Sequence, residues 1–249
     1  MLTVMQNFFL FIFCFIFSPF VFAKSMCPNG QYWVTGHHRR AYVRADGTFV
    51  SATTVKAHCK SYTKASEFLN SKFKNESPKN WPHKTEKFKS WTVEEKERLM
   101  EVFEELPEEL WSHALQGIYR SSKSREYPNP ATSADGIIVL YDSAFDDKAN
   151  LPRITGHELS HQLYKDLSDK DRQDYGYTTN WYSFGKDQYI SRKDGFVQDD
   201  GRESPDEDFS NNLEYYLFEP QTLKKATPNA YKWMKNHFGD KFKLRKGSK

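Results

Sequence analysis

The chain has 249 residues, a formal net charge of +3 and 38% hydrophobic residues. A charge this small argues against a nucleic acid partner, because domains that bind nucleic acid carry a strong basic patch. Removal of an N-terminal signal would leave about 225 residues, which is the size of one domain with a small appendage. Helical patterns outnumber strand patterns, and this balance predicts an α+β fold.

Residues 1–23 have the pattern of a secretory signal peptide. Residues 8–22 are almost wholly apolar and carry no charge, and Val21 and Ala23 offer small side chains where a signal peptidase cleaves. The apolar run is too short to span a bilayer comfortably, and an uncleaved membrane anchor is the alternative. We therefore expect a secreted or periplasmic protein without a stable membrane span after signal removal.

The next segment, residues 24–60, contains β-rich stretches and a hairpin turn signal at Ala45-Asp-Gly. Its two cysteines, Cys27 and Cys59, form an even pair in an exported chain, which predicts a disulfide. A unit of this size is too small to be stable by burial alone, so a crosslink is expected to hold it together. A metal site that uses its histidines is the alternative, but their spacing does not support one.

Residues 61–90 are polar, rich in lysine and interrupted by Pro78 and Pro82. This composition predicts a linker or an extended wrap over the surface rather than a domain. Aromatic residues within the segment offer anchors to a core.

Residues 91–249 have the patterns expected of the main domain. Thr92 and Glu95 are spaced as a capping box and precede apolar residues at helical spacing. A second scaffold helix is expected after Pro107, followed by a loop at residues 121–134.

A strand is predicted from Gly136 to Tyr141, just before the next helix. A strand in this position is expected to be a sheet edge beside that helix. An extended peptide could then add to it by main-chain hydrogen bonds.

The helix that follows carries His157-Glu158-Leu-Ser-His161, an HExxH motif, with apolar residues at helical spacing around it. Residues four apart lie on the same face of a helix, so both imidazoles can bind one zinc ion. Glu158 is then held beside the water that the zinc binds. The pattern predicts one Zn²⁺ per chain, and an ordinary polar surface helix is the alternative.

A catalytic zinc site of this type needs a third protein ligand and an open position. Tyr164 and Leu167 occupy the places where a metzincin has Gly and His, which excludes that class. Asp171 or Asp174, shortly after the helix, would serve in a site with an aspartate ligand.

A later predicted helix, residues 204–217, offers a better set of carboxylates. Ser204 is suited to the N-cap and Pro205 to the first turn, where Glu207 lies. Ser204 and Glu207 are also spaced as a capping box, so Glu207 could instead bond to the backbone of its own helix. Spacing alone leaves further candidate ligands open: Glu203, Asp206, Asp208 and Glu214.

The HExxH motif followed by Glu207-Asp-Phe-Ser-Asn-Asn-Leu213 resembles the gluzincin zinc peptidases. It is similar in particular to the catalytic domain of anthrax lethal factor and its relatives, where Glu-x-Phe-Ala-Glu-x-Phe follows the HExxH helix. The resemblance covers roughly residues 90–240 and implies a zincin-like fold with Glu207 as the third ligand. It places Asn211 where relatives have a carboxylate that accepts the outer N–H of a ligand histidine.

The relatives also use a tyrosine ahead of the third ligand to stabilise the oxyanion. The corresponding place, near Asp200, holds no tyrosine. Tyr182 or Tyr189, from the intervening loop, are the alternatives.

The resemblance implies an exported metallopeptidase that hydrolyses a peptide bond by a zinc-activated water, with Glu158 as the general base. Its partner would be a protein or peptide substrate. A non-catalytic surface or cell-envelope binding protein on a degenerate peptidase scaffold is the alternative function. A non-peptide substrate such as a cell-wall crosslink also stays open.

Overall fold

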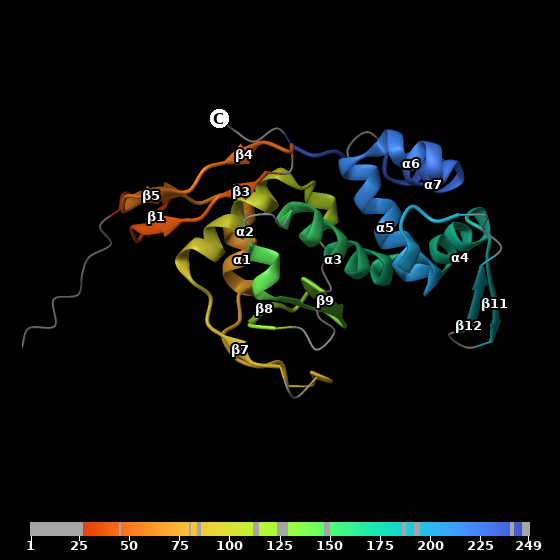
Figure 1. The fold of residues 1–249 in the computed structure, drawn as a ribbon, viewed down its shortest axis with the longest axis horizontal. Coiled ribbons are helices and arrows are strands. Elements are labelled where there is room, and N and C mark those ends of the chain that lie inside the picture. The colour runs from red at the N-terminus through yellow and green to blue at the C-terminus, as the bar shows by residue number, and fades with distance from the viewer. Residues whose placement is uncertain are drawn as a thin grey trace, which may run out of the picture.

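The computed structural model describes residues 27–44, 46–79, 81–83, 86–111, 115–123, 129–146, 150–185, 188–191, 195–239 and 242–245. The predicted signal peptide at residues 1–23 lies outside these ranges. Within them, helices and small sheets form the expected α+β fold (Figure 1). No helix of the described part is long and apolar enough to cross a membrane.

The N-terminal unit is one long, kinked β-hairpin. Three antiparallel pairs nest within one another: β1 (Gln31–Val34) with β6 (His58–Ser61), β2 (His37–Arg39) with β5 (Thr53–Val55), and β3 (Tyr42–Val43) with β4 (Phe49–Val50). A disulfide between Cys27 and Cys59 closes its base, which confirms the predicted crosslink.

This hairpin docks on α2 (Val93–Glu105) through acidic side chains of that helix. The backbone N–H of Arg40 donates to Glu94 at 2.7 Å, and His37 Nε2 lies 2.9 Å from Glu97 Oε2. Glutamates three apart lie on one face of a helix, so the contacts follow a stripe. The hairpin accordingly runs along α2 in Figure 1.

The segment at residues 61–90 is more structured than its composition predicted. It contributes α1 (Lys64–Lys72) and β7 (Phe88–Lys89). Thr63 caps α1 with its hydroxyl, and Leu69 is fully buried in the main core. Composition alone did not predict α1, because a few apolar side chains at helical spacing are enough to stabilise a short helix in a segment rich in lysine.

The main sheet has four strands in the order β7-β8-β10-β9. The inner strands are parallel and the last is antiparallel: β8 (Gly117–Ser121), β10 (Ile137–Leu140) and β9 (Ala131–Ala134). The strand predicted at residues 136–141 is therefore present, but its assignment to the sheet edge is wrong. The edge is β9, in the stretch predicted to be a loop.

The missed edge strand has a simple cause. Its sequence, Ala-Thr-Ser-Ala, lacks the alternation of large apolar and polar residues that marks a half-buried strand. Asp135 and Gly136 join it to β10 in a tight hairpin, and Gly136 has a positive φ of 72°. The scaffold helix predicted after Pro107 is likewise wrong: the described residues of this stretch form a 3₁₀ turn, η1 (Glu108–Leu110), and Ile118, predicted to lie in the helix, belongs to β8.

Helices form the other half of the molecule (Figure 1). They are α3 (Leu151–Asp166), α4 (Asp169–Thr178), α5 (Pro205–Phe218), α6 (Pro220–Ala226) and α7 (Pro228–Phe238). Short elements connect them: η2 (Asp142–Phe145), the hairpin of β11 (Trp181–Gly185) with β12 (Gln188–Ser191), and η3 (Asp199–Arg202). Helix α3 contacts both α5 and the edge strand β9.

The core holds α3 and α5 together. Leu159 of α3 and Phe209 and Leu213 of α5 are fully buried in one apolar cluster. Burial of such side chains stabilises by about 1.5–3 kcal/mol each. The relative position of α3 and α5 is therefore set by packing, and any side chains that face each other across them are held in place.

Candidate metal centre

Helix α3 presents the HExxH residues because its opposite faces are occupied by packing. Asn150 caps the helix by accepting from the N–H of Arg153, and Pro152 occupies the first turn. Gly156 permits a close approach by α5, since a Cβ there would lie 3.1 Å from the ring of Phe218. The two helices therefore cross where His157 begins the motif.

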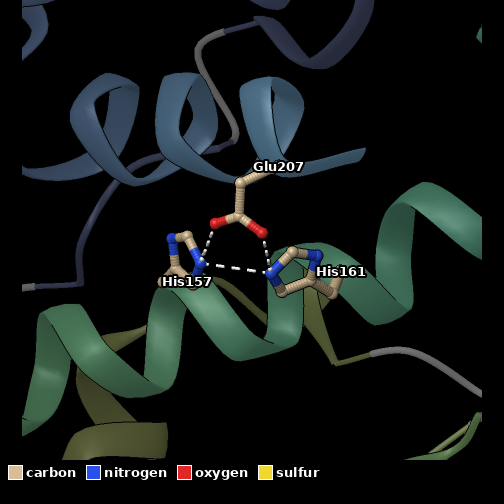
Figure 2. A group of neighbouring side chains, drawn as sticks. All are labelled: His157, His161 and Glu207. Carbon is tan, nitrogen blue, oxygen red and sulfur yellow. Dashed lines mark hydrogen bonds and ion pairs between the residues drawn. The ribbon is translucent and has the colours of Figure 1, made fainter. Parts of the chain in front are cut away.

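Helix α5 brings Glu207 to the same place. Ser204 caps the helix, accepting from the N–H of Glu207 at 3.0 Å. The carboxylate of Glu207 does not complete a capping box but reaches across to α3 (Figure 2). Glu207 therefore does not bond to the backbone of its own helix, which was the alternative that its spacing from Ser204 left open.

His157, His161 and Glu207 converge on one point. Each offers one ligand atom, and these atoms lie within 4.8 Å of one another. The two Nε2 atoms are 3.1 Å apart, and the Glu207 oxygens lie 3.1 Å from Nε2 of His157 and 3.4 Å from Nε2 of His161. Figure 2 shows the three groups pointing toward one another. In the described part of the chain, these three could hold a metal ion.

The histidine nitrogens have the separation that a small tetrahedral ion requires. Ligand atoms about 2.0–2.1 Å from a tetrahedral metal are separated from one another by about 3.3 Å. The two Nε2 atoms, 3.1 Å apart, are close to this value. Glu207 faces His157 with Oε1 and His161 with Oε2, so its carboxylate spans both nitrogens.

Carboxylates also pair with the outer nitrogens of both imidazoles. Nδ1 of His161 lies 2.8 Å from Asp206, and Nδ1 of His157 lies 3.4 Å from Glu214. Such partners orient the ring, keep Nε2 free as a ligand and raise its basicity. Both acids had been candidate ligands by spacing alone, and the structure assigns them to support of the rings instead.

Asn211 does not make the hydrogen bond to a ligand histidine that the family resemblance implied. It is fully buried, and its amide donates to Asp200 at 2.7 Å rather than accepting from His157 or His161. Asp206 lies next to Glu207 in the sequence, and Glu214 lies two helical turns further on. These spacings were visible, but nothing local indicated which carboxylate would meet which nitrogen.

Other acids considered as third ligands are held elsewhere. Asp208 accepts from Tyr175 and Trp181, each at 3.0 Å, behind α5. Asp174 accepts from the indole of Trp233 at 2.7 Å, and Asp171 bonds to Ser168 in the cap of α4. The bonds of Asp208 and Asp174 hold α4 and α7 against α5. The sequence alone did not predict this packing role.

The electrostatics of the trio are those of a carboxylate-rich cluster. Burial lowers the pKa of His157, but its bonds to Glu207 and Glu214 outweigh this and raise it well above the usual value. Burial raises the pKa of Glu207, but the hydrogen bond from His157 and the charges of both imidazoles lower it overall. The carboxylates around His157 therefore strongly favour a positive charge among these side chains.

Glu158 differs from the other acids of the cluster. It is 7% exposed, and among the described residues its Oε2 has no hydrogen-bond partner. Burial raises its pKa, against the effect of the two histidines. A buried carboxylate with a raised pKa and an unpartnered oxygen is suited to accept and return a proton.

The cluster lines an open hollow of about 830 Å³ between α3, α5 and β9. Ala131, Thr132 and Ser133 of β9 form part of its wall, together with the three candidate ligands. Neither Tyr182 nor Tyr189, the expected oxyanion donors, lines it. They belong to a neighbouring hollow around the β11–β12 hairpin.

Comparisons with known proteins add no relative. No family model matches the chain, and neither the curated proteins nor the solved structures give a match. The interpretation of the site therefore depends on its own geometry and chemistry.

Proposed function

We propose that this protein is an exported zinc-dependent metallopeptidase with a zincin-like fold of the gluzincin type. The observation that carries the proposal is the convergence of His157, His161 and Glu207, whose ligand atoms lie within 4.8 Å of one another, with Glu158 lining the same hollow. Two imidazoles and a carboxylate are a ligand set typical of catalytic zinc, which leaves one position open.

Zinc is the ion that this donor set favours. Calcium and magnesium prefer sites made of oxygen atoms alone, whereas imidazole nitrogens suit zinc and its neighbours in the first transition row. The surrounding carboxylates Asp206 and Glu214 would help neutralise the dication and hold both rings. A bound zinc ion would polarise the scissile carbonyl and lower the pKa of the attacking water.

The side chains of this chain would supply the proton transfers. Glu158 lines the hollow, and among the described residues its Oε2 has no hydrogen-bond partner, so it would accept a proton from the water and return it to the leaving amine.

The edge strand supports a peptide as the substrate. β9 pairs with β10 along one side, and the N–H of Tyr141 donates to Pro130 at the start of this ladder. Because hydrogen bonding alternates along an antiparallel pair, the main-chain groups of Ser133 are directed away from β10. Ser133 is partly exposed and lines the hollow, whereas Ala131 is fully buried, so an extended peptide could add as a further strand beginning at Ser133.

Export is supported by the disulfide between Cys27 and Cys59, because such crosslinks persist in oxidising compartments. The crosslink closes a β-hairpin that lies on α2 (Figure 1). We propose a secreted or periplasmic location on this basis together with the N-terminal apolar segment.

Metal analysis tests the proposal directly. Purified protein should contain about one zinc per chain, and Glu207→Ala should lose it. Glu203→Ala is the matched control, because Glu203 lines the same hollow while the trio and its supporting pairs involve other acids. Wild-type protein without zinc, or zinc retained by Glu207→Ala, would contradict the assignment. Zinc binding without hydrolysis of any peptide would favour the binding-protein alternative.

A further inference from the structure

A second hollow adjoins the metal centre. It has a volume of about 610 Å³, and Lys165 and Asp206 line both hollows. Asp206 is the partner of the ligand His161, so the second hollow begins directly beside the trio. The two hollows are therefore neighbours, separated by Lys165 and Asp206.

Aromatic side chains dominate the walls of this second hollow. Tyr164 rises from α3, Tyr177 from α4, and Trp181 and Tyr189 from the β11–β12 hairpin. Tyr177 is 77% exposed and Tyr189 is 46% exposed. Exposed tyrosines around a concave surface bury large apolar area on binding, with little loss of side-chain freedom.

Residues from both faces of the hairpin line the hollow. Ser183 pairs directly with Tyr189, so both lie on one face, and Tyr182 lies on the other. The neighbouring Ile190 is 53% exposed and pairs with Tyr182 in the adjacent register position. It does not line the hollow, and it therefore provides a matched control for Tyr189.

The direction of β9 relates this hollow to the scissile bond. Asp135, just past the C-terminal end of β9, lies 3.2 Å from Lys165 near the end of α3. A peptide that adds antiparallel to β9, the slightly more stable arrangement, runs in the opposite direction. Its residues on the N-terminal side of the scissile bond would then lie toward Lys165 and the aromatic hollow.

We propose that the hollow between α4, α5 and the β11–β12 hairpin binds an aromatic or large apolar side chain on the N-terminal side of the scissile bond. This inference rests on the proposed peptidase function. It identifies the substrate class as polypeptides with such a residue upstream of the cleavage point.

Metal-anchored probes test the inference without requiring turnover. N-acetyl-Phe-Phe-hydroxamate and N-acetyl-Ala-Ala-hydroxamate both place their residues on the upstream side, and a malonyl hydroxamate of phenylalanine amide places its ring downstream. Affinities for zinc-loaded full-length protein are measured by calorimetry, with acetohydroxamate as the reference. We expect the upstream Phe-Phe probe to bind about tenfold more tightly than the Ala-Ala probe.

Two hairpin variants localise the effect. Tyr189→Ser should reduce the preference for the Phe-Phe probe to about threefold or less, whereas Ile190→Ser should leave it unchanged. Both side chains are exposed, and equal melting temperatures would show that the fold is intact in each.

The outcomes separate the two proposals. If acetohydroxamate binds and the two upstream probes bind equally, the metal centre stands and the aromatic subsite is refuted. A preference that appears only with the downstream probe also refutes the assignment. If no hydroxamate binds to zinc-loaded protein, both proposals fail.

Discussion

Two buried clusters of charged side chains lie in this molecule, and they differ in how their charges are balanced. In the first, Arg120 is 1% exposed and lies 2.6 Å from Glu95 and 2.8 Å from Asp142. The guanidinium also donates to the carbonyl of Leu140 at 2.7 Å. A permanent cation therefore joins α2, β8, β10 and η2.

In the second cluster, which lies around His157, His161 and Glu207, none of the described residues places a permanent cation between the three side chains. The guanidinium of Arg153 bonds to Glu214 and Glu219 at the edge of the hollow. The nitrogen and oxygen atoms of the trio face one another, and within the described part of the chain Oε2 of Glu158 has no hydrogen-bond partner. The first cluster therefore contains its own cation, whereas the second is rich in carboxylates and could hold a metal ion.

The largest effect should come from Glu158→Gln. Losing the proton acceptor should lower peptide hydrolysis by about 10²- to 10⁴-fold, because general acid–base catalysis contributes that much. Zinc content should not change. Casein digestion and metal analysis measure the two properties, with Glu203→Gln as the control from the same hollow. Retained hydrolysis in Glu158→Gln would refute its role.

The corresponding change in the first cluster is Glu95→Gln. Glutamine keeps the capping box with Thr92 but leaves Arg120 without its closest carboxylate. The free energy of unfolding should fall by about 3 kcal/mol, as is typical of a broken buried ion pair. Urea unfolding measures this loss. Zinc content should stay at the wild-type value, and loss of zinc would show that the two clusters are not independent.

Metal removal should destabilise the protein by an intermediate amount. Zinc at 100 times its dissociation constant should raise the free energy of unfolding by about 2.7 kcal/mol, because it binds the folded state preferentially. Urea unfolding with zinc and with a chelator gives the difference. Glu207→Ala should show no response, and an equal response in this variant would place the zinc elsewhere.

A smaller effect is expected from the groups that hold the imidazoles. Asp206→Asn removes the charge beside His161 and should weaken zinc affinity by about 10- to 100-fold. Asn211→Ala should change affinity less, because its amide bonds to Asp200. Competition with a chromogenic chelator ranks the two variants. A larger effect at Asn211 would restore the role that family resemblance implied.

The smallest effect concerns the response to acid. Burial raises the pKa of Glu95, but the hydrogen bond from Arg120 lowers it below the usual value of 4.5. A carboxyl whose pKa is lower in the folded state contributes stability that is present above its unfolded pKa and is lost as the pH falls through the folded value. Unfolding measured from about pH 5 to 3 should therefore show a shallower loss in Glu95→Gln. An unchanged slope would contradict this.

Local patterns predicted what depends on neighbouring residues in the chain. Ser204 and Thr92 were identified as N-caps because capping involves residues three positions apart. The strand after residue 136 was found by its apolar run, whereas β9 was missed because its small polar residues become a strand only by pairing with β10. The linker predicted at residues 61–90 was wrong in part for the same reason, since α1 depends on packing.

The sequence by itself determined the histidine pair of α3, its neighbouring glutamate, the cysteine pair and the α+β composition. A helix repeats every 3.6 residues, so His157 and His161 must share a face wherever the helix lies. Spacing left several acids open as a third ligand, and family resemblance pointed to Glu207. The tertiary structure brings Glu207 to the two histidines and places Asp206 and Glu214 beside their outer nitrogens. That choice depends on how α5 crosses α3, which is set by side-chain packing between segments distant in the chain and leaves no local pattern.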